Sequence, residues 1–406
     1  MNRKLILAAT AIICLGFISH SQSKHSSFSN SSNNGHSSMT ITDDNLNFNF
    51  SYTNGEEISF TDDEKGFRTF PDDGILRYSK DGKKLTVTKD ASGNIVYEIH
   101  GGDKKTSLTE DEKNFVGTVI RVMIEYGIGA KDRVARLYKN GGTKAVMDEV
   151  KNMKTDYVRA IYLQFLLSTN NLSATDMTAI ANDAQSLISS DYEKGKLLEA
   201  FSSKYLSNAT TAKAFLDAVK SIRSDYEKAK AVKSILHQEL TDEQFTAVIE
   251  VANTVSSDYE KAGVLNEVIA NNKISPARFT ELLHATAKIS SDYEKAGVLK
   301  KVFETNVRVP ENAFVETLGA TASIGSDYEK SGVLKKIAES EIKSDENWAS
   351  LINATAKLGA DYEKGETLRF IATRMPSTDA VKDAYLKSAK TIGADYEYGK
   401  TIRALK

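Results

Sequence analysis

The stretch Ser257-Asp258-Tyr259-Glu260-Lys261-Ala262-Gly263-Val264-Leu265 decides the fold, because versions of it return throughout the C-terminal two thirds of the chain. A tyrosine follows an aspartate eight times, at steps of 33 to 35 residues. These residues are Tyr157, Tyr192, Tyr226, Tyr259, Tyr293, Tyr328, Tyr362 and Tyr396. A period of about 34 residues is typical of stacked two-helix units. The sequence therefore predicts a mostly α protein, with an α-solenoid of about eight two-helix repeats over residues 154–406.

The corner between the two helices of a unit carries a capping pattern. Ser257 fits the N-cap position, and Glu260 follows three residues later, so each side chain can bind the backbone N–H of the other residue. Asp258, in the first turn, also complements the helix dipole. Five units carry the full pair: Ser190 and Glu193, Ser224 and Glu227, Ser257 and Glu260, Ser291 and Glu294, and Ser326 and Glu329.

The residues after each tyrosine repeat in size. Three places on, the side chain is small, as at Ala262, and six places on it is aliphatic, as at Leu265. We interpret the tyrosine, the small residue and the aliphatic residue as one packed face, and the lysine two places after the tyrosine as part of a solvated face. In an alternative interpretation, the repeated Asp-Tyr-Glu-Lys is a ladder of binding residues whose tyrosines stack on a sugar or a peptide.

The first residues resemble an export signal. Arg3 and Lys4 precede an apolar stretch, and a small-x-small site ends at Ser21, so residues 1–21 are predicted to be a signal peptide. Cys14, the only cysteine, lies inside this segment. We do not expect a lipid anchor there, because Ile13 stands where a small residue normally precedes such a cysteine. The predicted location is periplasmic or secreted, with no stable membrane span after removal of the signal.

Three further segments precede the repeats. Residues 22–41 are nearly all Ser, Asn, His, Gly and Lys, which predicts a disordered linker. Alternating apolar residues and turn residues over 42–106 predict a small antiparallel β domain. Residues 107–153 are predicted to be connecting helices, with a helix start at Thr109 and a break at Gly141-Gly142.

The sequence lacks the common motifs that would indicate catalysis or cofactor binding. The chain has no His-Glu-x-x-His, glycine-rich phosphate loop or Gly-x-Ser-x-Gly turn, and the acidic runs at 62–64 and 72–73 do not match an EF-hand. A formal charge of −2 gives no broad basic field for nucleic acid. We predict no catalytic, cofactor-binding or metal-ligating residue, and no cofactor.

Two segments and the repeats carry a resemblance. They are Glu57-Ile58-Ser59-Phe60-Thr61-Asp62-Asp63-Glu64 and Gly129-Ala130-Lys131-Asp132-Arg133-Val134-Ala135-Arg136, followed by the Ser-Asp-Tyr-Glu repeats. Over residues 45–406 the chain resembles exported bacterial proteins of unclear function, similar to the extracytoplasmic region of antirepressor metallopeptidases related to beta-lactam sensors. This chain lacks their membrane spans and zinc motif. The resemblance implies a detached envelope module that senses or binds something, without peptidase activity.

These observations predict a non-enzymatic, exported binding or scaffold protein whose solenoid surface meets an envelope protein or peptide. The alternatives are a cell-wall or carbohydrate binder using the sheet or the tyrosines, and a hydrolase with unrecognised carboxylates. A hydrolase would require a converging pair of acidic residues in a cleft.

Overall fold

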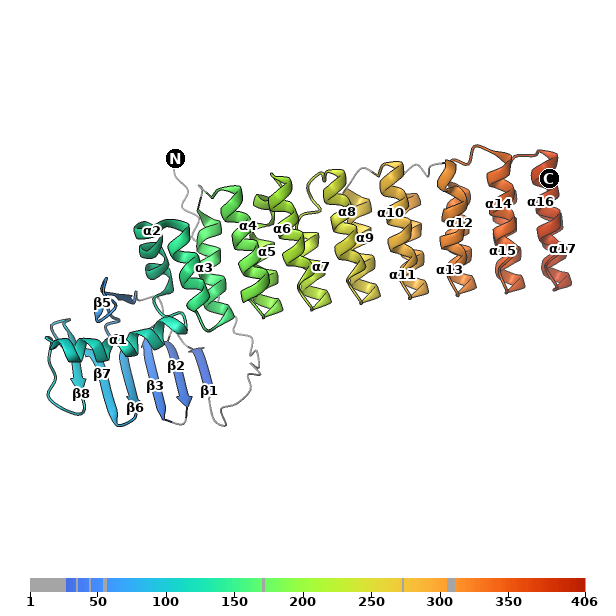
Figure 1. Cartoon of the computed structure of the whole chain (residues 1–406). Helices are drawn as coiled ribbons and strands as arrows, with labels where there is room; N and C mark the ends of the chain where they lie inside the picture. The colour runs from blue at the N-terminus through green and yellow to red at the C-terminus, as the bar shows by residue number, and fades with distance from the viewer. Residues whose placement is uncertain are drawn as a thin grey trace, which may run out of the picture. The chain divides into compact units, whose positions relative to one another are not determined.

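The structure is a computed structural model that describes residues 27–33, 36–43, 45–53, 57–169, 172–271, 274–304 and 311–405. The predicted signal peptide, and residues 22–26 of the predicted linker, lie outside these residues. The chain divides into two compact units, Met1–Phe165 and Leu166–Lys406 (Figure 1). We call them the N-terminal and C-terminal units.

The N-terminal unit contains an antiparallel sheet in the order β1-β2-β3-β6-β7-β8 and a separate pair, β4-β5. The strands are β1 (Ser27–Asn33), β2 (His36–Asp43), β3 (Leu46–Thr53), β4 (Ser59–Phe60), β5 (Phe67–Thr69), β6 (Ile75–Lys80), β7 (Lys83–Lys89) and β8 (Ile95–Ile99). Alternate residues such as Phe48, Phe50 and Leu76 are fully buried. The predicted antiparallel β domain is therefore confirmed.

The prediction of a disordered linker over residues 22–41 is wrong for residues 27–33 and 36–41, which lie in β1 and β2. Strand β2 pairs along the whole of β3, with Met39 opposite Phe50 and Ile41 opposite Phe48. Met39 and Ile41 are buried on the apolar face of the sheet. Backbone pairing with the edge of β3, together with this short alternation, stabilises a strand that composition alone did not reveal.

Helices follow the sheet in the N-terminal unit. Helix α1 (Glu110–Glu125) begins with a full capping box between Thr109 and Glu112, and its Phe115 ring lies 5.9 Å from that of Tyr78 on the sheet. The span labelled α2 (Ala130–Asn152) is two helical pieces, because Gly142 has φ of 63° there. This confirms the predicted helix start and the glycine break. Helix α3 (Asp156–Ser168) crosses the boundary between the units.

The C-terminal unit is a row of helix pairs (Figure 1). Its elements are α4 (Ala174–Leu187), α5 (Asp191–Tyr205), α6 (Ala209–Lys220), α7 (Asp225–Lys233), α8 (Asp242–Asn253), α9 (Asp258–Asn271), α10 (Pro276–Ala287), α11 (Asp292–Glu304), η1 (Glu311–Ala313), α12 (Phe314–Ala322), α13 (Asp327–Glu339), α14 (Asp345–Thr355), α15 (Asp361–Ala372), α16 (Asp379–Ala389) and α17 (Asp395–Ala404). First helices pack on first helices and second helices on second helices. The predicted α-solenoid is confirmed.

The seam between second helices has the predicted small and aliphatic residues. Ala262 and Ala296 are at most 1% exposed, and so are Leu265 and Leu299. The small side chain lets the neighbouring helix approach closely, and the aliphatic side chain fills the space one turn further on.

Only half of the predicted capping box forms at the five corners. The serine oxygen accepts the backbone N–H three residues later, as in Ser257 with Glu260 at 3.3 Å. At the last four of these corners, the serine's own N–H donates to an aspartate of the preceding unit instead of to the glutamate. At this corner the acceptor is Asp225, at 2.7 Å. The reciprocal bond was predicted wrongly because the neighbouring unit supplies a better placed carboxylate.

This inter-unit bond repeats as what we call the aspartate ladder. Each ladder aspartate accepts two consecutive backbone N–H groups from the corner of the next unit, at 2.7 to 3.1 Å. The ladder residues are Asp191, Asp225, Asp258, Asp292, Asp327 and Asp361. These bonds use donors that every helix start leaves unpaired, so they join one unit to the next.

The ladder predicts a sensitivity to acid. The N–H groups of Gly325 and Ser326 hold the pKa of Asp292 below its usual value of 3.8. A carboxylate whose pKa is depressed by folding stabilises the fold above its unfolded pKa, and this contribution disappears as pH falls through the folded pKa. Between neutral pH and about pH 3, the melting temperature of the parent should therefore fall toward that of Asp292→Asn. Trp348 fluorescence checks this, and a difference independent of pH would contradict it.

Five of the six motif lysines are buried and Lys330 is half-buried, so their interpretation as a solvated face was wrong. Lys228, Lys295 and Lys364 are 5 to 6% exposed. Their Nζ atoms reach the end of the first helix in the next unit, where Lys364 donates to the Thr391 carbonyl at 2.9 Å. A cation at a helix C-terminus satisfies carbonyl groups that have no partner in the helix and complements the dipole. The long apolar stem of lysine makes this burial tolerable.

Candidate functional site

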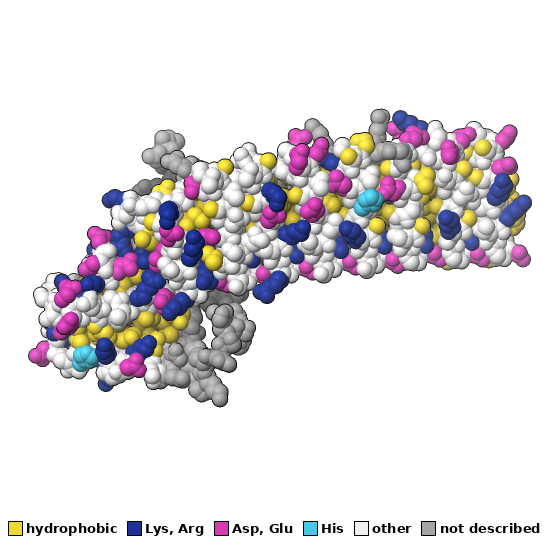
Figure 2. All heavy atoms as spheres, in the orientation of Figure 1, with side chains coloured by type: hydrophobic (Ala, Val, Ile, Leu, Met, Phe, Trp, Pro, Cys, Tyr) yellow, Lys and Arg dark blue, Asp and Glu magenta, His cyan; other side chains and the backbone are white. Residues whose placement is uncertain are grey.

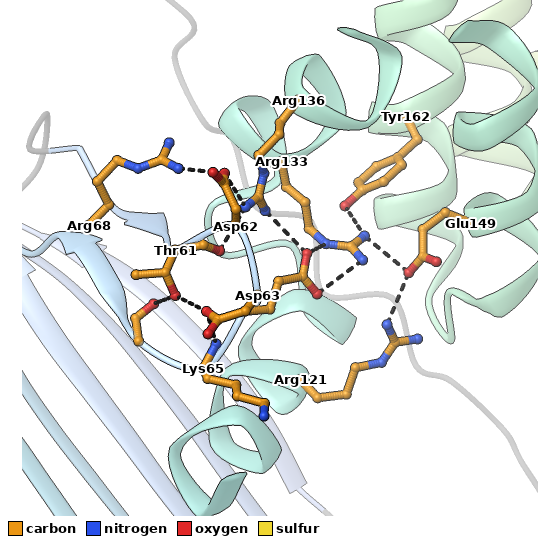
Figure 3. Close-up of polar contacts among 12 residues, drawn as sticks. Thr61, Asp62, Asp63, Lys65, Arg68, Arg121, Arg133, Arg136, Glu149 and Tyr162 are labelled. Atoms are coloured by element: carbon orange, nitrogen blue, oxygen red, sulfur yellow. Dashed lines mark hydrogen bonds and ion pairs between the residues drawn. The ribbon is translucent and has the colours of Figure 1, made fainter. Parts of the chain in front are cut away.

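A network of charged side chains in the N-terminal unit is the first candidate (Figure 3). Arg133, from α2, is 4% exposed and lies between two carboxylates. Its Nε donates to Glu64 Oε1 at 2.6 Å, and its Nη1 lies 3.0 Å from Glu149 Oε1. Nη1 also donates to the Tyr162 hydroxyl at 2.9 Å. Arg121 donates to the same Glu149 oxygen at 3.0 Å.

The network joins residues 57–64, which include β4, to residues 129–136 at the start of α2. Arg136 donates to the Thr61 carbonyl at 2.7 Å and contacts Glu64 at 3.2 Å. Gly129 is needed for the same contact, because a Cβ there would lie 2.7 Å from the Phe60 ring. The loop between β4 and β5 is thus held against α2 by both charge and close packing.

The acidic residues of this loop are already engaged by the protein. Hydrogen bonds from Arg68 and Arg136 hold the pKa of Asp62 below its usual value, and a hydrogen bond from Thr61 does the same for Asp63. For Arg133, burial alone would lower the pKa, but the hydrogen bonds from its guanidinium to Glu64 and Tyr162 raise it overall. The charges in the network compensate one another. We therefore interpret the network as a structural contact that holds the loop between β4 and β5 against α2.

Among the described residues, no group of three or more His, Cys, Asp or Glu side chains is placed to hold a metal ion. An open depression of about 520 Å³ in the N-terminal unit is lined by Lys89, Lys104, Lys105 and a single carboxylate, Asp90, and so contains no converging acid pair. In the part of the chain that the structure describes, no helix is both long and apolar enough to cross a membrane.

The motif tyrosines form the second candidate, and the structure corrects their predicted burial. All eight are 48 to 71% exposed. With Val315 they are the large hydrophobic side chains that lie exposed in the described residues. We call the seven in the C-terminal unit the tyrosine row: Tyr192, Tyr226, Tyr259, Tyr293, Tyr328, Tyr362 and Tyr396. Tyr157, which is 56% exposed, belongs to the N-terminal unit.

The row lies along one edge of the C-terminal unit. Each row tyrosine is the second residue of a second helix, and these helices run parallel and pack on one another. Packed helices lie about 8–10 Å apart, which sets the approximate distance between neighbouring tyrosines. Within the described residues, the hydroxyl groups of Tyr259, Tyr293 and Tyr328 form no hydrogen bond. The row therefore offers ring faces and hydroxyl groups at regular steps.

Several charged residues beside the tyrosines are paired within the protein. Three motif glutamates contact a basic residue of the preceding unit: Glu329 with Lys300 and Glu397 with Arg369, both at 2.7 Å, and Glu260 with Lys233 at 3.6 Å. The ladder aspartates hold backbone N–H groups, and five of the six motif lysines are buried. On the face shown in Figure 2, basic and acidic side chains are interspersed over the C-terminal unit. Basic side chains lie beside the ends of the row, where Lys196 Nζ is 5.8 Å from the centre of the Tyr192 ring and Lys400 Nζ is 5.0 Å from that of Tyr396.

No protein-family model matches the sequence, and no curated protein matches it.

Proposed function

We propose that this protein is a non-enzymatic binding scaffold of the cell envelope, which uses the tyrosine row to hold a partner. Export rests on the signal-like residues 1–21, and binding rests on the row. The resemblance to exported bacterial proteins supports only the envelope location in this proposal. We do not propose peptidase activity.

The observation that carries this proposal is that the motif tyrosine is repeated in every unit although its side chain is exposed. The cap serine, the glutamate and the lysine of the motif are each replaced in some units, by Ala360, Val158 and Tyr398 for example. The tyrosine is present in all eight units, although its side chain is largely exposed and the core is built without it. An exposed aromatic residue repeated without a packing purpose favours a binding surface.

A triple substitution tests the proposal. Immobilised parent protein should retain material from an envelope extract, and Tyr259→Ala/Tyr293→Ala/Tyr328→Ala should retain at least tenfold less. The matched control is Val315→Ala, which removes an exposed apolar side chain outside the row and should bind like the parent. Retained protein and retained amino sugar are both measured. Equal retention by the parent and the triple variant would exclude the row as the binding surface.

A further inference from the structure

The regular spacing of the tyrosine row restricts what can bind to it. The row presents the same side chain, at the same helix position, at steps of about 8–10 Å. A folded protein or an ordinary peptide changes its side chains along its length, so it meets each tyrosine with a different group. A polymer with a chemical repeat of similar length meets every tyrosine in the same way. Engaging several tyrosines at once then increases affinity without any strong single contact.

The chemistry of the row favours sugar rings. Tyr259, Tyr293 and Tyr328 are 70 to 71% exposed, so a ring face is open to a ligand. An aromatic ring packs against the C–H face of a pyranose, while the phenol hydroxyl exchanges hydrogen bonds with sugar hydroxyl groups. The open hydroxyl groups of these tyrosines provide that second contact.

Charge separates a glycan from the other repeating polymer that stacks on aromatic rings. Single-stranded nucleic acid needs a positive groove beside the stacking residues. Here Lys228, Lys261 and Lys295 are buried toward helix ends, and Lys300 is paired with Glu329. Lys196 and Lys400 lie over the rings of Tyr192 and Tyr396, at the two ends of the row, whereas among the described residues no cation lies over the ring of Tyr259, Tyr293 or Tyr328. The centre of the row therefore lacks the continuous positive groove that a phosphate backbone requires, and a polymer without a phosphate charge at every step fits better.

From these properties we infer that the row binds a linear β-1,4-linked glycan, such as the amino-sugar strands of a bacterial cell wall. In an extended β-1,4-linked chain every second sugar presents the same face, and this disaccharide repeat is close in length to the spacing of packed helices. Each row tyrosine stacks on one sugar of a disaccharide. The inference rests on the proposed function, because it names the partner of the same surface.

The experiment uses the full chain and two probes, protein-free cell-wall sacculi and β-1,4-linked N-acetylglucosamine oligomers from the disaccharide to the octasaccharide. The parent should sediment with sacculi, and its affinity for oligomers should rise at least tenfold between the shortest and the longest. The Tyr259→Ala/Tyr293→Ala/Tyr328→Ala variant should lose both the sedimentation and the length dependence. Val315→Ala should keep both, and unchanged circular dichroism of the triple variant shows that it is folded.

The outcomes separate this inference from the proposed function. A parent that ignores sacculi and oligomers, but retains an envelope protein through the row, overturns the glycan and leaves the binding scaffold standing. Binding to sacculi that is unchanged in the triple variant overturns the inference as well, because it places the glycan elsewhere. If the parent retains no envelope component through the tyrosine row, both the glycan inference and the proposed binding function are overturned.

Discussion

Arg133→Met should destabilise the N-terminal unit by about 3 kcal/mol, because Glu64 and Glu149 lose the buried partner they share and keep only the more exposed Arg136 and Arg121. The Arg133 side chain is 4% exposed and those of Glu64 and Glu149 are 27% and 15% exposed. Methionine fills a similar volume, so the expected loss comes from weaker charge compensation more than from a cavity. The Tyr162 hydroxyl, fully buried with its side chain, also loses its hydrogen-bond donor.

The single tryptophan makes this effect measurable in one unit. Trp348 lies buried in α14 of the C-terminal unit, so its fluorescence follows the array, whereas far-ultraviolet circular dichroism follows both units. Arg133→Met should shift the dichroism transition and leave the Trp348 transition in place. The control is Arg68→Met, whose ion pair with Asp62 is exposed and should leave both transitions unchanged.

A second variant tests the physical cause. If incompletely compensated carboxylates are responsible, adding Glu64→Gln to Arg133→Met should recover part of the lost stability, because it removes one of the two carboxylates that have lost Arg133. A double variant that melts below Arg133→Met would point to packing around Arg133 instead. Parent-like melting of Arg133→Met would show that the network does not fasten the loop to α2.

The architecture could be predicted from the sequence because it depends on local repetition. The interval between tyrosines, the small residue at Ala262 and the aliphatic residue at Leu265 are set by helix geometry within one unit, and all were interpreted correctly. The alternation around Phe48 and Phe50 predicted the sheet for the same reason. Strands β1 and β2, where a disordered linker was predicted, have mostly polar sequences. They depend on backbone pairing within the sheet that includes β3, and composition does not reveal such pairing.

The exposure of the tyrosines could have been predicted from the spacing of the buried positions along the second helix, which the packing interpretation did not take into account. In α9 the buried positions come in pairs, Lys261 with Ala262, Val264 with Leu265, and Val268 with Ile269. Extending this stripe back by seven residues from Val264 and Leu265 reaches Ser257 and Asp258, and not Tyr259. A helical projection of the motif thus places the tyrosine beside the core stripe and toward solvent.

Contacts between neighbouring helix-pair repeats could not be predicted from the sequence pattern. The burial of Lys228 and the two bonds accepted by Asp258 depend on where the next unit lies, and a single unit gives each residue an adequate local explanation. For Asp258 that explanation was the helix dipole, which is correct and incomplete. Residues whose partners are about 32 positions away need the stacked structure.

Asp258→Ala should therefore cost the array more than its local surroundings indicate. The Asp258 carboxylate accepts the N–H of Ser291 at 2.7 Å and of Ser290 at 3.1 Å, and it is half-buried. Hydrogen bonds to a charged group contribute about 1.5–3 kcal/mol each, and partial exposure reduces the sum, so we expect a loss of about 2–3 kcal/mol in the Trp348 transition. In a stacked array, weakening one interface loosens the units on both sides.

Asp395→Ala is the matched control, because Asp395 occupies the same motif position but, within the described residues, accepts no N–H from another unit. It should lose only its interaction with the helix dipole, about 0.3–1 kcal/mol. Hydrogen exchange gives a local test: the amides of Ser290 and Ser291 should exchange faster in Asp258→Ala and not in Asp395→Ala. Equal losses of stability in the two variants would show that the ladder adds nothing beyond the dipole, and that burial along the seam alone holds the units together.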